Sequence, residues 1–332
     1  MSTAPIIFLG IDISKATFDV ALLSGGKRNG KSSKHAKFDN TPSGFEQLSH
    51  WLQGNALGAI HACLEATNIY GHDLATYLHE QGHQVSIVNP ARIKGYAKSQ
   101  LSRTKNDAAD AALIARFCRD IQPSLWHPTP AAIAQLQSLT RRLKALEQML
   151  TQEKNRLELC RDSELRTDIE AHIEFLEKQA KALKERCQQH IQGEESLAEP
   201  CRLLTSITGI AEHSASIILA EIGSIKVFGS AAQLAAFAGL TPQEHQSGSS
   251  INGKARLCKI GNAHLREALF FPALSLMRHC PEVRAFRQRL LDNGKHKMAV
   301  VGAVMHKLIR VIYAVLSSGQ EFDPKKLAPQ QS

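Results

Sequence analysis

The sequence lacks the features that mark secreted, membrane-spanning and zinc-binding proteins. Its seven cysteines are odd in number, are scattered along the chain and never form a C-x-x-C pair, which argues against a disulfide framework and a zinc site. No apolar run approaches the roughly 20 residues that cross a bilayer, and the N-terminus lacks the layout of a signal peptide. We therefore expect a protein of the reducing cytoplasm with no membrane partner.

Aromatic residues are also scarce, at 5% of the chain, and the 31 acidic residues are outnumbered by 40 lysines and arginines. The formal charge of +9 favours a polyanionic partner such as nucleic acid, although a basic surface can also serve solubility alone. A hydrophobic content of 43% is ordinary for a globular protein, and 332 residues suffice for two or three domains.

Residues 6–15 form the first strong pattern, an apolar run that contains one carboxylate, Asp12. Such a run is typical of a strand that is covered on both faces of a sheet. A carboxylate inside it costs several kcal/mol unless it is paired or bound to a cation, so Asp12 is a candidate metal ligand. The alternative is that Asp12 only caps the turn that follows the strand.

The next segments predict an α/β domain. Strands are expected at residues 18–23, 35–38, 59–64 and 84–88, and helices after residue 42, through residues 74–78, and at residues 91–99 and 104–117. The order is three strands, helix, strand, helix, strand, helix. Three consecutive antiparallel strands give the simplest topology.

Three further acids fall where they could join Asp12. Glu65 ends the fourth strand, while Asp107 and Asp110 lie one turn apart on the closing helix, where they repel each other unless a cation lies between them. Helix N-terminal charge is the alternative explanation for Asp107. Four acids at one edge of a mixed sheet resemble the active site of ribonuclease-H-like Holliday-junction resolvases, and hard oxygen ligands suit Mg²⁺ or Mn²⁺.

Actin-like ATPases and sugar kinases share this strand order and begin with a similar strand. They normally place Gly-Ser or Gly-Thr after the aspartate, whereas residues 13–15 here are Ile-Ser-Lys. The nucleotide-binding alternative is therefore disfavoured.

The middle of the chain predicts a linker and a helical hairpin. Three prolines within residues 123–130 exclude regular structure, so a domain boundary is expected there. Leucines and isoleucines then recur at spacings near three and four over residues 139–157 and again over residues 165–183. This stripe predicts a coiled coil, which either joins subunits or packs the two arms of the hairpin together.

The last third contains two segments of interest. Residues 203–223 indicate helix, glycine turn and helix, which resembles the helix-hairpin-helix module that binds phosphate, although a plain helical corner would show the same pattern. Residues 240–262 form a long polar segment with three serines beside Lys254, Arg256 and Lys259. Such a segment could supply a hydroxyl nucleophile and cations for a phosphate, or could be only a flexible loop.

Taken together, these motifs resemble the insertion sequence 110 family of transposases, which is related to the Piv-type DNA invertases. The resemblance covers nearly the whole chain and rests on residues 10–12, 65–67, Tyr70, 89–90, 105–107, 110–111, 209–210, 237–242, 247–248, 259–262 and 265–266. Two positions depart from the family pattern, because Asn68 stands in place of Gly and Asn106 in place of Thr or Ser.

The resemblance implies a role for each part of the chain. It assigns Asp12, Glu65, Asp107 and Asp110 as metal ligands and Ser247 as the nucleophile, with Ser249 and Ser250 as neighbouring candidates. It also implies a structured non-coding bridge RNA that selects target and donor DNA. The expected nucleic-acid contacts are Lys105, Lys254, Arg256, Lys259 and Arg266.

The expected organisation is a ribonuclease-H-like domain at residues 1–122, a linker and coiled-coil hairpin at 123–197, an all-α C-terminal domain at 198–322 and a polar tail at 323–332. The expected function is RNA-guided DNA recombination through a phosphoserine intermediate, by a dimer or tetramer whose active site is shared between subunits. Three alternatives remain open: a metal-dependent junction endonuclease, a DNA invertase without a guide, and a non-catalytic nucleic-acid-binding protein.

Overall fold

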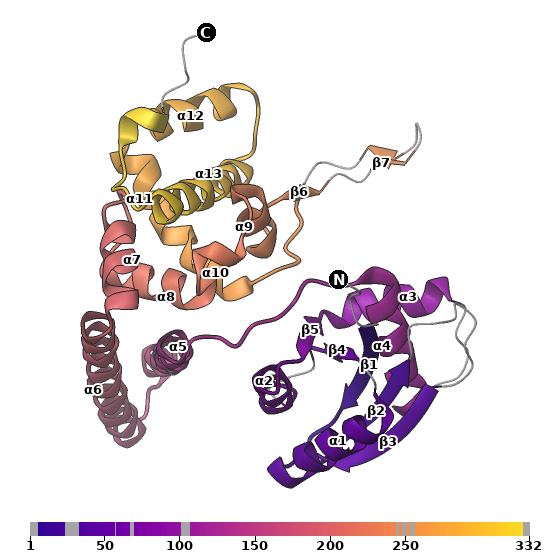
Figure 1. Cartoon of the computed structure of the whole chain (residues 1–332). Helices are drawn as coiled ribbons and strands as arrows, with labels where there is room; N and C mark the ends of the chain where they lie inside the picture. Colours follow the sequence, from indigo (N-terminus) through magenta and orange to yellow (C-terminus); the bar gives the residue numbers. More distant parts are fainter. Residues whose placement is uncertain are drawn as a thin grey trace. The chain divides into compact units, whose positions relative to one another are not determined.

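The computed structural model describes residues 6–23, 33–56, 58–66, 70–100, 107–243, 246–247, 251–252 and 256–327 (Figure 1). The chain divides into two compact units, Met1–Pro128 and Thr129–Ser332. This boundary lies inside the proline-rich segment where the sequence predicts a linker. The finer boundaries expected at residues 122, 197 and 322 stay predictions.

The first unit is built on a mixed five-stranded sheet with the strand order β3-β2-β1-β4-β5. Strand β1 pairs antiparallel with β2 and parallel with β4. The order of the elements along the chain confirms the predicted alternation of strands and helices. The elements are β1 (Ile6–Ile13), β2 (Thr17–Leu23), β3 (Ser33–Asp39), α1 (Pro42–Asn55), β4 (Ala59–Glu65), α2 (His72–Glu80), β5 (Gln84–Val88), α3 (Pro90–Ser99) and α4 (Asp107–Ile121).

Helices cover both faces of this sheet, which explains why β1 is apolar at nearly every position. Ile7, Leu9 and Ile11 of β1 pack in one buried cluster with residues of α1 and α2. Phe8 belongs to a second cluster, on the opposite face, that includes residues of α3 and α4. Because side chains alternate along a strand, Gly10 and Asp12 share the face of Phe8 and lie under α4.

The second unit is mostly helical. Its elements are α5 (Ala131–Leu159), α6 (Ser163–Gly193), α7 (Glu195–Thr205), α8 (Glu212–Ile222), η1 (Ile225–Val227), α9 (Ala231–Phe237), β6 (Pro242–Gln243), β7 (Gln246–Ser247), β8 (Ile251–Asn252), β9 (Arg256–Leu257), α10 (Ala263–Ala268), α11 (Phe270–His279), α12 (Pro281–Asp292), α13 (Lys297–Ser318) and η2 (Pro324–Leu327). The expected all-α domain is therefore corrected, because β6 pairs with β9 and β7 with β8, which satisfies the backbone groups of a segment without helix.

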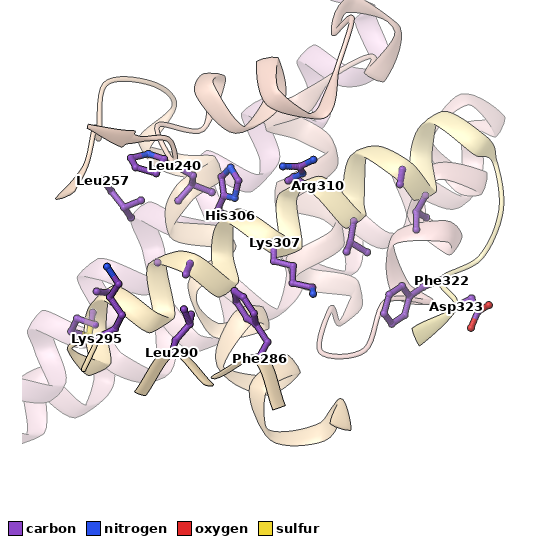
Figure 2. Close-up of a pocket in the computed structure, with 18 of the residues that line it drawn as sticks. Leu240, Leu257, Phe286, Leu290, Lys295, His306, Lys307, Arg310, Phe322 and Asp323 are labelled. Carbon is purple, nitrogen blue, oxygen red and sulfur yellow. The ribbon is translucent and has the colours of Figure 1, made fainter. Parts of the chain in front are cut away.

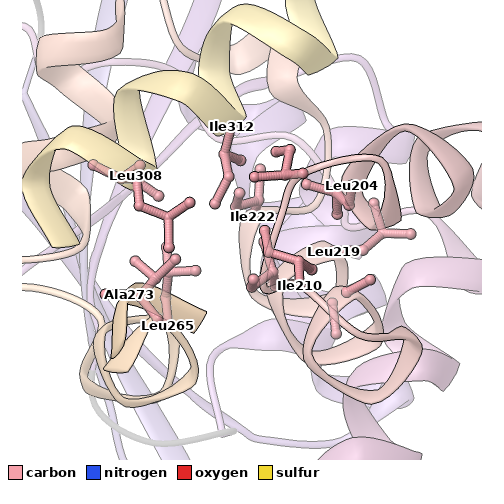
Figure 3. Close-up of a cluster of buried hydrophobic side chains, with 14 of the residues drawn as sticks. Leu204, Ile210, Leu219, Ile222, Leu265, Ala273, Leu308 and Ile312 are labelled. Atoms are coloured by element: carbon pink, nitrogen blue, oxygen red, sulfur yellow. The ribbon is translucent and has the colours of Figure 1, made fainter. Parts of the chain in front are cut away.

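One core spans this unit from the hairpin to the last helix. Leu139 and Leu143 of α5 and Leu176 of α6 are buried, so much of the predicted stripe packs the two arms of the hairpin together. Figure 3 shows the part of the core where residues of α7 and α8 face α10, α11 and α13.

Helix α13 corrects one expectation from the sequence. By length and composition alone, with a mean hydropathy of 1.8 over its most apolar stretch, it could cross a membrane, contrary to the expectation that no apolar run approaches that length. In this structure α13 is the central helix of the core, and its Val304, Leu308 and Ile312 are fully buried.

Candidate active site

The candidate active site lies on the face of the first sheet that α4 covers, and it begins with a row of charged residues across three strands. Asp12 of β1 lies directly opposite Asp19 of β2, which in turn lies opposite Lys37 of β3. Residues paired in this way have neighbouring side chains, and two like charges in such a pair destabilise the sheet. The row therefore places two carboxylates together where a cation would relieve their repulsion.

Glu65 joins this row from the other side of β1. Gly10 pairs with Cys63 in the parallel ladder, so Glu65, two residues later, is level with Asp12 and shares its face. The chain leaves the sheet at this point, and the amide of Ala66 donates a hydrogen bond of 2.8 Å to the carbonyl of Val88.

Gly10 allows α4 to bring two further acids to Asp12. A Cβ atom on Gly10 would lie 2.1 Å from the carbonyl oxygen of Ala111 and 2.2 Å from the amide nitrogen of Ala115, so only glycine permits the backbone of α4 to approach β1 this closely. Asp110 immediately precedes Ala111, and Asp107 lies one turn further toward the N-terminus. The close approach therefore fixes both acids near the end of β1.

The electrostatics of Asp12 show that these groups converge. Its pKa is raised from 3.8 to about 6, first by burial of the half-buried carboxyl and then by the negative charges of Asp110, Asp107, Glu65 and Asp19. The structure thus brings the other three predicted acids, Glu65, Asp107 and Asp110, close to Asp12. Their catalytic and metal-binding roles stay predictions.

Two members of this cluster were missed in the sequence, Asp19 and Lys37. The Lys37 Nζ lies 3.1 Å from Asp19 Oδ2 and 3.9 Å from Asp107 Oδ2. The hydrogen bond and charge of Asp19 raise the pKa of Lys37. The sequence did show that Asp19 is a charged residue inside the predicted strand at residues 18–23. Its pairing with Asp12 and Lys37, however, depends on the register between strands, which sequence spacing alone does not reveal.

The donor chemistry of this cluster fits a hard divalent cation. All its anionic members are carboxylates, the ligands that Mg²⁺ and Mn²⁺ prefer, and after burial the charges of four neighbouring carboxylates also raise the pKa of Asp12. Across the described ranges, however, no group of three or more histidine, cysteine or acidic side chains is already arranged as a ligand set. Side-chain rotation would have to complete the coordination.

The predicted serine lies in the second unit. Ser247 belongs to β7 and pairs with Ile251 of β8, which places it on a short two-stranded ladder. Arg256 lies in β9, opposite Gln243 of β6. Lys105, Ser249, Ser250 and Lys254 lie outside the described residues.

Hydrogen bonds and close packing hold together the two ends of residues 240–262, the segment that contains Ser247; we call these two ends the base of the segment. Arg266 donates hydrogen bonds to the carbonyls of Ala238 and Lys259, at 3.0 and 3.2 Å, and so joins the two ends of the segment. Gly261, with a φ of 147°, packs against the Phe237 carbonyl, where a Cβ would come within 2.4 Å. In this structure Arg266 therefore has a structural role, while Lys259 is exposed, and contact of either with nucleic acid stays a prediction.

A buried carboxylate connects this base to the hairpin. Glu221 of α8 accepts hydrogen bonds from Arg141 Nε and Nη2 of α5, at 3.2 and 3.3 Å, and from Asn262 Nδ2, at 2.8 Å. Only 2% of the Glu221 side chain is exposed. The Glu221 carboxylate therefore links α5, α8 and the N-terminus of α10, which are far apart in the sequence.

The glycine turn between α7 and α8 serves packing. Gly209 has a φ of 95°, and a Cβ there would lie 2.8 Å from the Pro272 carbonyl of α11. Ile207 and Ile210, the second of which is labelled in Figure 3, are buried on either side of it. The helical-corner interpretation accounts for these contacts, and phosphate binding at this turn stays a prediction.

Comparison with known proteins assigns a relationship to both units. A family model of the DEDD transposase domain, described as a transposase, matches residues 9–160, and the model of the transposase IS116/IS110/IS902 family matches residues 201–288. The chain is 33% identical to the pilin gene-inverting protein of Moraxella bovis over 322 residues, covering 96% of this chain and 98% of that protein. It is 25% identical to the transposase of insertion sequence element IS1328 of Yersinia enterocolitica, covering 96% of this chain and 98% of that protein.

Proposed function

This chain belongs to the IS116/IS110/IS902 family of transposases, and from that membership we propose that it is a site-specific DNA recombinase guided by a structured non-coding RNA. Transposases cleave and transfer DNA strands, so the protein is an enzyme that binds DNA. Its DEDD domain implies the use of a divalent metal ion. We further propose that it works in the bacterial cytoplasm, in association with the nucleoid.

The observation that supports this proposal is the convergence of acids around Asp12. Four carboxylates raise its pKa in addition to burial, and three of them are the other members of the expected ligand set. We assign Asp12, Glu65, Asp107 and Asp110 to hold Mg²⁺ or Mn²⁺. When bound, the metal would assist the attacking oxygen and stabilise the leaving oxygen of a phosphodiester.

Ser247 is the proposed nucleophile. Its hydroxyl oxygen would bond to phosphorus, one deoxyribose oxygen would leave, and the hydroxyl proton would pass to solvent or to a neighbouring base, which leaves a phosphoserine that a second deoxyribose hydroxyl can resolve. Ser247 and the acids belong to different compact units. We therefore propose a dimer or tetramer in which the acids of one protomer act with the serine of another.

A second candidate is DNA inversion without a guide RNA. The relative from Moraxella bovis, 33% identical over nearly the whole length of both proteins, is named for inversion of a pilin gene. Sequencing of RNA that co-purifies with the protein distinguishes the two. A single structured RNA whose alteration redirects the DNA target supports guided recombination, whereas equal affinity for all RNAs and a fixed DNA site supports an invertase.

The covalent step is tested with labelled DNA on denaturing gels. Ser247→Ala should bind DNA and form no covalent protein–DNA adduct, whereas Ser249→Ala and Ser250→Ala should retain adducts. Mixing Ser247→Ala with Asp12→Ala chains should restore part of the activity, because each supplies the group that the other lacks. Cleavage by Ser247→Ala without an adduct would instead identify water as the nucleophile and the protein as a metal-dependent junction endonuclease.

A further inference from the structure

A groove with a volume of about 1150 Å³ runs along α13 in the second unit (Figure 2). Residues of α13 form its floor, Phe286 and Leu290 of α12 line one side, and Leu240 and Leu257, from the segment that contains Ser247, line the other. Pockets for small molecules measure about 300–1,000 Å³, so this groove has room for a longer ligand. We call this feature the α13 groove.

Small and aromatic residues give the α13 groove an apolar surface. Ala299, Gly302 and Ala303 line its floor, and Gly302 lies so close to the opposite wall that a Cβ there would come within 3.0 Å of Leu257 Cδ1. Ala299 is exposed, so the floor is open to a ligand. The Phe286 ring adds an aromatic surface, on which nucleic-acid bases stack.

Cations lie beside this apolar floor. Lys307 Nζ is 5.0 Å from the centre of the Phe286 ring, and its pKa is lowered first by burial and then by the charge of Arg289. His306 and Arg310 are one turn apart on α13, and the pKa of His306 is lowered by burial and then by Arg310. Because neighbouring positive charges add to the effect of burial at both groups, an anion would be attracted here.

Three further features of the charge point to a polyanion. Lys259, Lys295 and Arg310 all line the groove, all are exposed, and none of them belongs to an ion pair between described residues. Cations around an apolar and aromatic floor are the arrangement by which proteins hold a single nucleic-acid strand, with its phosphates on the cations and its bases on the floor.

Two acids limit this site to one part of the groove. Glu321, which pairs with Arg202, and Asp323 line the groove beyond the C-terminus of α13, where they would repel a phosphate. The helix from Ala299 to Arg310 rises about 16 Å, which about five nucleotides span at the 3.4 Å spacing of a stacked strand. The cationic part of the groove therefore suits a short strand.

A single strand of DNA fits these features better than a duplex does. A duplex stacks its bases on one another and turns its phosphates outward, so it would leave the apolar floor uncovered. Leu240, Pro242 and Leu257 of the Ser247 segment line the groove, so DNA bound by that segment has the groove beside it.

We propose that the α13 groove binds a short single-stranded stretch of the DNA on which Ser247 acts. The bases lie against Ala299, Ala303 and Phe286, and the phosphates lie near Lys295 and Arg310. This inference rests on the proposed DNA recombination and identifies a strand-binding site for it. Strand exchange separates the two strands of a duplex, and a groove that binds one of them stabilises the separated state.

Fluorescence anisotropy of a labelled six-nucleotide DNA strand measures this binding. The full chain carrying Ser247→Ala is used without Mg²⁺, so that no cleavage occurs. Arg310→Gln and Lys295→Gln should each weaken binding three- to tenfold and should each lower the slope of log affinity against log salt by about 0.7. Arg287→Gln removes an exposed cation of α12 that does not line the groove, and it should change the affinity less than twofold.

A change of shape tests the floor independently of charge. Ala299→Leu fills the floor and should weaken binding at least tenfold without changing the salt slope. Ala314→Leu is the matched control, because it makes the same substitution at an exposed position of α13 on the acidic side of Arg310, outside the proposed strand site. Circular dichroism verifies that each variant is folded.

Several results would overturn the proposal. Unchanged binding in Arg310→Gln and Ala299→Leu would place the strand elsewhere, and at least tenfold tighter binding of an RNA strand, lost in the same variants, would assign the groove to RNA. An equal response of a hairpin duplex would show that only backbone charge is bound.

Adduct formation by chains that retain Ser247 reports separately on the proposed function. Normal adducts in Ala299→Leu, with unchanged strand binding, would remove only the groove. Strand binding that depends on Ala299 and Arg310, with no adduct in the natural chain, would support the groove and remove only the serine mechanism.

Discussion

A Cβ atom on Gly10 would lie 2.1 Å from the carbonyl oxygen of Ala111. This contact between β1 and α4 determines how closely Asp107 and Asp110 approach Asp12, since Asp110 is the neighbour of Ala111 in the chain. The carboxylate cluster therefore depends on the absence of a single methyl group two residues before Asp12.

We predict that Gly10→Ala separates α4 from β1 and abolishes DNA cleavage. The added methyl group meets backbone atoms, which cannot rotate away, so the free energy of unfolding should fall by about 1–3 kcal/mol. Denaturant titration and a cleavage assay measure the two effects. Gly95→Ala is the matched control, because no atom lies near its Cβ position in α3, and it should stabilise the helix by up to about 1 kcal/mol. Full activity in Gly10→Ala would contradict this account of the site.

Asp12→Asn should stabilise the metal-free protein near neutral pH. The folded-state pKa of about 6 lies above the ordinary 3.8, so the favourable contribution of Asp12 is fully present below pH 3.8 and is lost as the pH rises through 6. Full conversion at about 1.4 kcal/mol for each pKa unit would give about 3 kcal/mol, and because solvent screens the half-buried carboxyl, the gain above pH 7 should be about 1–2 kcal/mol.

Thermal unfolding between pH 4 and 8 measures this effect, and Asp292→Asn, an exposed change on α12, serves as the control. Mg²⁺ should stabilise the natural chain more than Asp12→Asn, because the variant lacks one proposed ligand. Equal responses of both chains to Mg²⁺ would remove Asp12 from the metal site.

Lys37→Met should raise the affinity for Mg²⁺ severalfold. Lys37 compensates Asp19 and lies close to Asp107, so its removal leaves more negative charge for the metal to neutralise. The same change should raise the pKa of Asp12 further, because a nearby positive charge is lost. Isothermal titration with Mg²⁺ measures the affinity. Lys34→Met, on the same strand but bonded to Asn55, should leave it unchanged.

Glu221→Ala should destabilise the second unit by about 1–3 kcal/mol, because Asn262 and Arg141 lose their shared acceptor, although water can rehydrate the Arg141 side chain, which is 52% exposed. Glu267→Ala is the matched control, since Glu267 also pairs with a cation of α5 but is 65% exposed and should cost at most about 1 kcal/mol. Denaturant unfolding followed by circular dichroism compares them. Equal costs would show that burial does not determine the strength of this link.

The sequence by itself determined the elements of the first unit and four members of its acidic cluster. Apolar runs mark strands covered on both faces, and three-to-four spacing marks helices, because both patterns depend on residues that are neighbours in the chain. The apolar strand around Asp12, the strand that ends at Glu65 and the helix that begins at Asp107 are local in this sense. Each could therefore be identified without knowledge of the other two.

Only the tertiary structure determined that Asp19 and Lys37 are the neighbours of these acids. The pairing of Asp12 with Asp19, and of Asp19 with Lys37, depends on strand register, and a shift by one residue would turn either side chain to the opposite face. Long-range packing determines both pairings, because the free energy that selects them comes from contacts between residues far apart in the chain.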